Sequence, residues 1–281
     1  MFKILSSDRI APKEYDFWVE APRIAERTTP GQFIVLRADE RGERIPLTIA
    51  DFDRERGAIR IIFQAVGKST AKLASFKKGD EIRDISGPLG NASEIERYGT
   101  VMMVGGGVGI AALFPIIRGL KQAGNKVVTI LGGRSSELVI MKGECAKFSD
   151  ELIVTTDDGS EGMKGLVTDA MKMVVQRGDA IDRVWAIGPS IMMKFCTITA
   201  AELKLPIWVS MNPIMVDGTG MCGCCRLNVG DEIKFGCVDG PEFDGHKVDW
   251  NDFMNRMKQY KDEERVSMEK YEAEVGDLSW L

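Results

Sequence analysis

Short runs of alternating apolar and polar residues, separated by turn residues, occupy the first third of the chain. Alternation with a period of two is typical of strands that bury one face. Pro30-Gly31 and Lys78-Gly79-Asp80 are turn signals, and each stands directly before an apolar run. The predicted strands are residues 2–10, 15–20, 32–37, 44–50, 58–64 and 81–85. This pattern predicts a small antiparallel β-barrel over residues 1–96.

From Tyr98 onward, apolar runs alternate with segments of helical periodicity. The runs are residues 101–104, 127–131, 152–155, 184–187 and 207–209. After the first run, apolar side chains follow the three-and-four spacing of a helix with one buried face, at Ile110, Leu113, Phe114, Ile117 and Leu120. Gly124 stands where a helix C-cap is expected. We therefore predict a five-stranded parallel sheet covered on both faces, a Rossmann-like α/β domain, over residues 97–212.

The rest of the chain divides into a cysteine-rich segment, residues 213–250, and a charged tail, residues 251–281. We predict that the tail is helical. It is either a solvated amphipathic helix or a surface that docks onto a partner subunit, because it carries more apolar side chains than a free tail usually displays. These side chains are Phe253, Met254, Met257, Tyr260, Met268, Tyr271 and Trp280.

Composition narrows the classes of function. The chain has 281 residues, of which 44% are hydrophobic and 28% charged, with a formal net charge of -5. It contains no basic run interleaved with aromatic residues, so we expect no nucleic-acid partner. Its apolar stretches are shorter than the roughly 20 residues that a membrane-spanning helix needs, so we expect no membrane span. No secretory signal opens the sequence, and we expect a reducing, cytoplasmic location in which Cys145 and Cys196 are buried structural thiols.

One carboxylate and three cysteines near the C-terminus have iron-sulfur spacing. They are Asp217, Cys222, Cys225 and Cys237, with gaps of four, two and eleven residues. The plant-type two-iron cluster uses Cys-x4-Cys-x2-Cys and a more distant cysteine. A carboxylate oxygen can bind ferric iron in the first position. Glycines at 218, 220 and 223 suit a loop that wraps closely around a cluster.

Other interpretations of this segment remain open. A zinc ion could be held by Cys222, Cys225 and Cys237 with His246, the single histidine of the chain. The thiols could also be free of metal, although thiols this close together are prone to oxidation. Cys224 lies beside the candidate ligands and offers an alternative ligand set.

Glycine-rich turns at the ends of the predicted parallel strands indicate a nucleotide site. Gly105-Gly106-Gly107-Val108-Gly109 follows the first strand and opens the first helix, where backbone amides and the helix dipole favour a diphosphate. No acidic residue closes the second strand, and Arg134 could meet a ribose or a 2′-phosphate. Asp157-Asp158 and Gly188-Pro189 follow the third and fourth strands and lie on the same carboxyl edge. The choice between NAD and NADP stays open.

Two segments of the predicted barrel could hold a flavin. Arg44-Ile45-Pro46-Leu47-Thr48 offers a hydroxyl on a strand. Gly67-Lys68-Ser69-Thr70 offers backbone amides and hydroxyls at the beginning of a predicted helix. Neither segment is diagnostic without the other domains.

With the barrel, the glycine turn and the cysteine loop in this order, residues 1 to about 250 resemble the electron-transfer subunits of the ferredoxin-NADP reductase superfamily. The nearest groups are the dihydroorotate dehydrogenase electron-transfer subunit and the small subunit of NADH-dependent ferredoxin:NADP oxidoreductase, also described as sulfide dehydrogenase. The resemblance implies FAD in the barrel, NAD(H) on the α/β domain and a [2Fe-2S] cluster in the C-terminal loop.

The flavin motif of the family, Arg-Pro-[Ile/Leu]-[Ser/Thr], falls on residues 45–48, with its arginine displaced to Arg44. The resemblance adds a second flavin segment, Ile62-Phe63-Gln64, and matches a Gly-x-Gly-Thr motif to residues 67–70, with Ser69 in place of glycine. Asp217 replaces the first cluster cysteine of the dihydroorotate group. In this respect the chain is similar to the bifurcating transhydrogenase small subunit, in which one aspartate and three cysteines hold the cluster.

The function implied is electron transfer between NAD(H), FAD and the cluster, and onward to a large flavin and iron-sulfur subunit in a heterodimer or higher assembly that bifurcates electrons. A flavin must stand between a two-electron hydride donor and a one-electron acceptor. The first alternative is the electron-transfer subunit of an NAD-dependent dihydroorotate dehydrogenase. The second is a non-catalytic zinc or iron-sulfur sensor.

Overall fold

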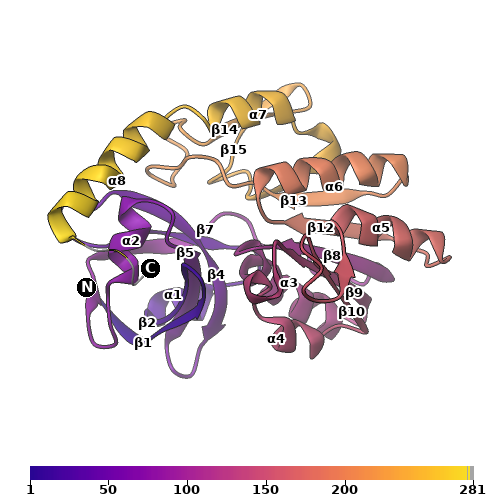
Figure 1. Ribbon diagram of the computed structural model, residues 1–281, viewed down its shortest axis with the longest axis horizontal. Coiled ribbons are helices and arrows are strands. Elements are labelled where there is room, and N and C mark those ends of the chain that lie inside the picture. The colour runs from indigo at the N-terminus through magenta and orange to yellow at the C-terminus, as the bar shows by residue number, and fades with distance from the viewer. Residues whose placement is uncertain (277, 279–281) are drawn as a thin grey trace.

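The computed structural model describes residues 1–276 and residue 278, which form two seven-stranded sheets and a C-terminal part that arches across them (Figure 1). The first sheet is antiparallel, has the order β6-β1-β2-β5-β4-β3-β7 and nearly closes into a barrel. Its strands are β1 (Phe2–Ala11), β2 (Glu14–Glu20), β3 (Phe33–Arg37), β4 (Arg44–Asp53), β5 (Ala58–Gln64), β6 (Glu81–Ile82) and β7 (Asp84–Leu89). The predicted fold class of a barrel followed by an α/β domain is confirmed.

Every second side chain of the barrel strands points inward, and these side chains fill the barrel core. Ile34 and Leu36 of β3 point into its core, where they join Phe17 and Phe63. Helices α1 (Pro22–Arg27) and α2 (Lys68–Ala74) add further apolar residues to this core. The predicted strand 81–85 is two strands, because the chain changes partner at Arg83: Ile82 pairs with β1, whereas Asp84 pairs with Arg37 of β3.

The second sheet is parallel except at one edge. Its order is β11-β10-β9-β8-β12-β13-β16, and only β16 runs antiparallel. The strands are β8 (Thr100–Gly106), β9 (Lys126–Gly133), β10 (Glu151–Thr156), β11 (Met163–Lys164), β12 (Arg183–Ile187), β13 (Ile207–Ser210) and β16 (Glu242–Asp244). All five predicted parallel strands are present. The sequence pattern missed β11 and β16, which are only two and three residues long.

Helices cover both faces of this sheet. Residues of α3 (Gly109–Gln122) and α4 (Lys142–Ala146) pack on one face, and residues of α5 (Val167–Gln176) and α6 (Ser190–Glu202) pack on the other. A short 3₁₀ helix, η1 (Ser136–Leu138), follows β9. Helix α3 ends where the sequence predicted, because Gly124 adopts a φ of +87° just after the last turn of this helix. Cys145 and Cys196 are buried in the two apolar layers, as expected for structural thiols.

The cysteine-rich segment folds against both sheets. It contains a hairpin of β14 (Arg226–Val229) and β15 (Glu232–Phe235) and, after β16, the 3₁₀ helix η2 (Gly245–Lys247). Glu242 of β16 lies where the parts of the chain meet. Its carboxylate accepts hydrogen bonds from the hydroxyl of Ser93 and from the indole nitrogen of Trp185, the latter at 3.1 Å. Burial raises the pKa of Glu242, and these two hydrogen bonds oppose the rise.

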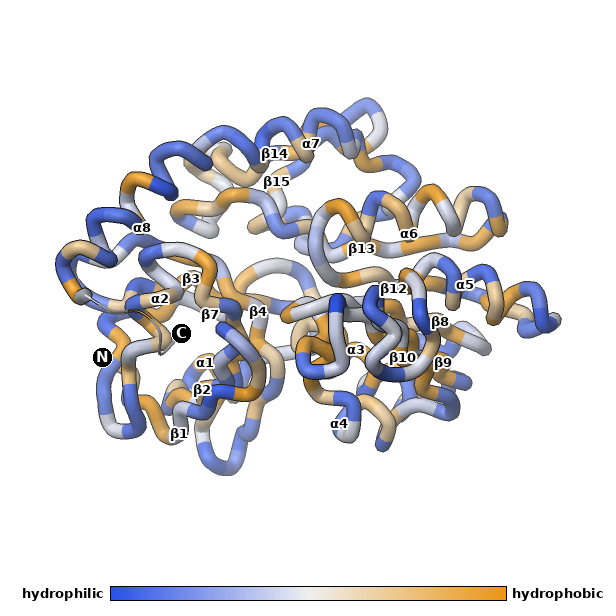
Figure 2. Tube along the Cα trace, viewed as in Figure 1, coloured by the Kyte–Doolittle hydropathy of each residue, from blue (hydrophilic) through white to orange (hydrophobic). Residues whose placement is uncertain are grey.

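The tail is helical, as predicted, with α7 (Trp250–Arg256) and α8 (Lys261–Val275). Helix α8 crosses over the barrel and is hydrophilic over most of its length (Figure 2). Two apolar residues that were predicted to face either solvent or a partner are instead buried within the chain: Phe253 in the α/β core and Tyr271 in the barrel core. This burial removes them from any docking surface, and Trp280 lies outside the described residues. No helix in the described part of the chain has both the length and the apolar character needed to cross a bilayer.

Ion pairs join the barrel to the α/β domain. The guanidinium of Arg60 on β5 lies 2.6 Å from Asp16 on β2 and 2.7 Å from Glu144 on α4. Arg118 of α3 lies 2.6 Å from Asp51 of β4. These pairs fix how the two domains face each other.

Glu14 is a buried carboxyl group on the strand that carries Asp16. It is 1% exposed, its Oε2 has no hydrogen-bond partner among the described residues, and burial raises its pKa to about 7. Its backbone pairs with Gln64 of the second candidate flavin segment. Ionisation of Glu14 therefore costs more free energy in the folded protein than in the unfolded chain.

Replacing Glu242 with alanine should lower the free energy of unfolding by about 1–3 kcal/mol, because it leaves the Ser93 hydroxyl and the Trp185 indole without their acceptor. Chemical denaturation would measure the loss. The matched control is Glu232→Ala, which removes an exposed carboxylate paired with Lys234. Equal losses in the two variants would show that Glu242 does not hold the parts together.

Replacing Glu14 with glutamine should change how stability depends on pH. The folded-state pKa is raised, so wild-type protein loses stability as pH rises from about 4.5 to about 7, by up to about 3 kcal/mol. Glu14→Gln should remove this loss and be the more stable protein above pH 7. Denaturant titrations at pH 5 and pH 8, with the exposed Glu20→Gln as control, would check it. A wild-type pH dependence that persists in Glu14→Gln would contradict it.

Candidate functional site

The cysteine loop begins after β13 and is shaped by glycine. Gly218, Gly220 and Gly223 have φ of +75°, +83° and +67°, a region that side chains other than glycine rarely adopt. A Cβ on Gly218 would lie 2.8 Å from a side-chain carbon of Leu89 and 3.1 Å from one of Val35. The glycines therefore let the loop turn repeatedly and lie close against β3 and β7 of the barrel.

Two of the candidate ligands meet in the interior. The sulfurs of Cys225 and Cys237 are 3.3 Å apart, and these residues are 1% and 2% exposed. This separation exceeds a disulfide bond of about 2.05 Å, so both thiols are free. Burial and the neighbouring Cys225 raise the pKa of Cys237 to about 12. Thiolates at this position need a cation beside them, which suits the donor set of an iron-sulfur cluster.

The other two candidate ligands lie on the same loop at the surface. Cys222 is exposed, and the carboxylate of Asp217 accepts hydrogen bonds from the backbone of Thr219 at 2.8 Å and of Cys222 at 3.0 Å. These hydrogen bonds hold the pKa of Asp217 below its usual value. Among the described residues, no three His, Cys, Asp or Glu side chains group closely enough to hold one metal ion. The structure thus brings Cys225 and Cys237 together and leaves Asp217 and Cys222 at the rim.

The alternative ligands have different surroundings. His246 lies in η2, and its Nε2 is 2.9 Å from the carbonyl oxygen of Leu205, a contact that engages this nitrogen within the α/β domain. Cys224 is partly buried between the candidate ligands, and burial raises its pKa. The backbone carbonyl of Cys224 accepts a hydrogen bond from Arg256 of α7, which ties the loop to the tail.

The glycine turn after β8 lies against the loop that follows β12. A Cβ on Gly109 would be 2.5 Å from the Cα of Gly188, and a Cβ on Gly106 would be 2.3 Å from the sulfur of Met192. Gly107, with a φ of +53°, has no atom within 4 Å of its Cβ position. Gly105–Gly109 and Gly188-Pro189 are therefore brought together, and Gly107 borders open space, as a backbone that receives a diphosphate must.

Arg134, Asp157 and Asp158 lie at the same edge of the sheet. The amides of Asp157 and Asp158 donate to the carbonyl oxygens of Gly133 at 3.1 Å and of Arg134 at 3.2 Å. Ser160 donates its hydroxyl and its amide to the carboxylate of Asp158, which lowers the pKa of Asp158. The loops after β9 and β10 thus form one hydrogen-bonded rim.

The candidate flavin residues divide between the two faces of the barrel. The outer face carries Pro46, Thr48, Ile62 and Gln64, because the residues that alternate with them pack in the barrel core. Leu47 packs against the barrel core, and Phe63 lies within it, 5.1 Å from Phe17 in an edge-to-face contact. The side chains of these two residues point away from any ligand on the outer face. Arg44 is exposed at the beginning of β4.

The second flavin segment lies at the beginning of α2. The hydroxyl oxygen of Thr70 accepts hydrogen bonds from the amides of Val66 at 3.1 Å and Gly67 at 3.2 Å. A Cβ on Gly67 would have no neighbour within 4 Å. Lys68 and Ser69 line a cavity beside the barrel.

The cysteine loop and the helix that follows the glycine turn both pack on the barrel beside the candidate flavin residues. Phe33 and Val35 of β3 pack with Cys225 and Cys237. Their partners in register on β4 are Thr48 and Pro46, the candidate flavin residues. On the other side, α3, the helix that follows the glycine turn, packs against β4, and Ile62 of β5 belongs to the same apolar cluster as α3. Neighbouring strands are about 4.8 Å apart, so the cysteine loop lies one strand from the flavin segment on β4.

Sequence patterns did not reveal some residues that shape these sites. Phe33 and Val35 look like ordinary strand residues, and only their contact with the cysteine loop gives them a role. Tyr271 of the tail lines the cavity beside Lys68 and Ser69, and no local pattern connects residues so far apart in the chain.

Comparisons with known proteins agree with this arrangement. A family model of the iron-sulfur cluster binding domain of dihydroorotate dehydrogenase B matches residues 212–249. The dihydroorotate dehydrogenase B (NAD(+)) electron transfer subunit homolog of Thermotoga maritima is 53% identical, covering 98% of this chain and 97% of that protein. The dihydroorotate dehydrogenase B (NAD(+)) electron transfer subunit of Desulforamulus reducens is 32% identical, covering 88% of this chain and 97% of its own length.

Among solved structures, a chain of the NADH-dependent reduced ferredoxin-NADP oxidoreductase, studied for flavin-based electron bifurcation, superposes with a TM-score of 0.92. It is 53% identical, and the match covers 96% of this chain and 98% of that chain. The resemblance to electron-transfer subunits of the ferredoxin-NADP reductase superfamily is confirmed. The protein therefore belongs to the family of dihydroorotate dehydrogenase B electron transfer subunits and is an oxidoreductase subunit with an iron-sulfur cluster binding domain.

Proposed function

We propose that this chain carries electrons from NADH through FAD to a [2Fe-2S] cluster and on to a larger partner subunit. The observation that carries the proposal is that the cysteine loop and α3, the helix that follows the glycine turn, both pack beside the strand that carries the candidate flavin residues. A bound flavin would supply the exchange between two-electron and one-electron transfer. The experiment that tests it is anaerobic addition of NADH to the purified protein, followed by flavin absorbance and by the electron paramagnetic resonance signal of reduced iron.

The residues of this chain would bind and orient the groups. The turn at Gly107 would receive the diphosphate of the nucleotide, with Arg134 and Asp158 near its ribose. Thr48 and Gln64 would offer polar contacts to the flavin on the outer face of the barrel. Phe33 and Val35, which pack against the buried Cys225 and Cys237, would keep water out between the flavin segment and the cluster.

Asp217, Cys222, Cys225 and Cys237 would hold the cluster. Three thiolates and one carboxylate suit ferric iron, and the rim position of Asp217 and Cys222 would leave one side of the cluster near the surface. Met221, 89% exposed between these two ligands, would lie on the surface from which electrons leave. The six free cysteines suit a reducing, cytoplasmic location.

The partner would be a larger flavin and iron-sulfur subunit in a heterodimer. One relative of known structure is a chain of an NADH-dependent reduced ferredoxin-NADP oxidoreductase studied for electron bifurcation, which supports this assembly. The second candidate function is electron transfer to a dihydroorotate dehydrogenase, favoured by the name of the relative at 32% identity. Co-purification from the native source would separate the two by the identity of the large subunit and by its activity with dihydroorotate.

The ligand set can be tested with neighbouring serine substitutions. Cys225→Ser should lose most of the iron and sulfide, because it removes one of two buried sulfurs at the centre of the site. Cys224→Ser is the matched control and should keep them. Iron and sulfide content per chain and the visible spectrum are the measurements. The reverse pattern, with loss in Cys224→Ser alone, would make Cys224 the ligand and overturn the assignment.

The nucleotide site can be tested with two glycines that both have a positive φ, +53° at Gly107 and +87° at Gly124. Gly107→Ala and Gly124→Ala each add a methyl group at a positive φ with no atom within 4 Å, so each should cost about 1–2 kcal/mol of stability. Only Gly107 borders the candidate diphosphate site. We expect the KM for NADH to rise roughly tenfold in Gly107→Ala and to stay near the wild-type value in Gly124→Ala. A similar KM in both variants would argue against diphosphate binding at this turn.

A further inference from the structure

Glu14 is a buried carboxyl group for which the fold provides no partner. It begins β2, its side chain belongs to a residue only 1% exposed, and its Oε2 accepts no hydrogen bond from any described residue. Among the buried side-chain oxygens and nitrogens of the described residues, only this atom and the Nε of Arg83 lack a partner. A buried polar atom without a partner costs stability, so its position calls for a group that binds there.

The strand register places this carboxyl group on the face of the barrel proposed for the flavin. Tyr15 and Phe17 of β2 point into the barrel core, so Glu14, which alternates with them, stands on the outer face. Glu14 pairs in register with Gln64 of β5, which also stands on the outer face. Residues directly opposite in an antiparallel pair have Cβ atoms about 4.5–5.5 Å apart. The carboxyl group of Glu14 therefore borders the side chain of Gln64.

The two outward carboxyl groups of β2 have different surroundings. Asp16 lies 2.6 Å from Arg60, and Arg60 also lies 2.7 Å from Glu144 of α4. The charge of Asp16 is thus balanced where the α/β domain covers the barrel. Glu14 has no such cation among the described residues, and burial raises its pKa to about 7. Near neutral pH much of this group is protonated, and a protonated carboxyl group can both donate and accept a hydrogen bond.

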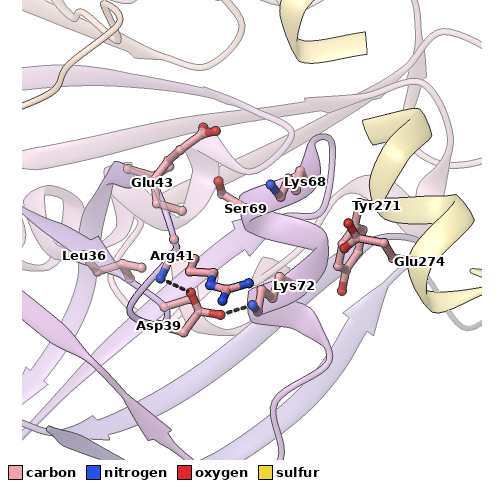
Figure 3. A pocket seen from close by; sticks show the side chains of 12 residues that line it. Leu36, Asp39, Arg41, Glu43, Lys68, Ser69, Lys72, Tyr271 and Glu274 are labelled. Atoms are coloured by element: carbon pink, nitrogen blue, oxygen red, sulfur yellow. Dashed lines mark hydrogen bonds and ion pairs between the residues drawn. The ribbon is translucent and has the colours of Figure 1, made fainter. Parts of the chain in front are cut away.

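The backbone beside Glu14 is fixed to the candidate flavin segment. Lys13 has a φ of +62°, which residues other than glycine rarely adopt, and its carbonyl oxygen accepts a hydrogen bond of 2.8 Å from the amide of Ala65. The chain then leads from Ala65 to Lys68 and Ser69, which line the cavity beside α2 (Figure 3). Glu14 is therefore held next to the end of β5.

We propose that Glu14 is a further flavin-binding residue, whose carboxyl group forms a hydrogen bond with a polar atom of the flavin beside Gln64. This inference rests on the proposed function, because it requires a flavin on the outer face of β4 and β5. A flavin has carbonyl oxygens and ring nitrogens that accept hydrogen bonds and a ribityl chain whose hydroxyls donate and accept them. A protonated carboxyl group matches either, and binding would give the buried oxygen of Glu14 the partner that the described residues do not supply.

The test measures the affinity of the flavin-free, full-length protein for FAD and for FMN at pH 6, where Glu14 is mostly protonated. Glu14→Met has a similar size but no hydrogen-bonding group, so it should bind both flavins roughly tenfold more weakly, because both carry the same ring and ribityl chain. Glu14→Gln keeps a donor and an acceptor and should stay within about twofold of wild type. Glu20→Met, at the exposed end of the same strand, is the matched control and should bind both flavins as wild type does.

The stability of the flavin-free variants separates binding from a structural role. Neither substitution removes a hydrogen bond within the described residues, so the free energy of unfolding should not fall at pH 6 in Glu14→Met or Glu14→Gln. Unchanged affinity in Glu14→Met, or equal weakening in Glu14→Met and Glu14→Gln, would overturn the role of Glu14 while leaving electron transfer through a flavin intact. If wild-type protein binds neither flavin, the proposed function fails, and the inference fails with it.

Discussion

The carboxylate of Glu242 is the constraint on which the arrangement of the parts depends. It lies on the antiparallel edge strand of the second sheet and accepts hydrogen bonds from Ser93, in the connection after the barrel, and from Trp185, on a central parallel strand. Burying a carboxylate costs free energy unless its oxygens accept hydrogen bonds. The segments that carry Glu242, Ser93 and Trp185 are therefore most stable when they are in contact. The cysteine segment is thereby fixed against both sheets at once.

This junction has a consequence for electron transfer. With β16 held in the sheet, the preceding loop lies against β3, and Cys225 and Cys237 pack on Phe33 and Val35. The neighbouring strand, β4, carries candidate flavin residues and also contacts α3, the first helix of the α/β domain. Ion pairs of Arg60 and Arg118 hold that domain in place. Electron transfer requires fixed, short separations, and these contacts supply them within one chain.

Much of the fold could be predicted from periodicity, because strands and helices that bury one face leave a regular pattern. The five parallel strands and the helix that ends before Gly124 follow this rule. The elements that were missed, β11 and β16, are too short to carry a period, and the change of partner at Arg83 depends on pairing between distant strands. The tail was correctly predicted as helical, but the burial of Phe253 and Tyr271 depends on surfaces far away in the chain.

By itself, the sequence determined the chemistry that is available: the spacing of one aspartate and three cysteines, the glycines of a diphosphate turn, and the order of barrel, α/β domain and cysteine loop. These features are local, because ligand type and backbone freedom belong to individual residues and their near neighbours. Only the tertiary structure decided which residues meet. Packing placed the thiols one strand from the flavin segment, turned Phe63 into the core and brought Tyr271 to a cavity beside Lys68, since contacts between distant segments arise only when the whole chain buries its apolar faces together.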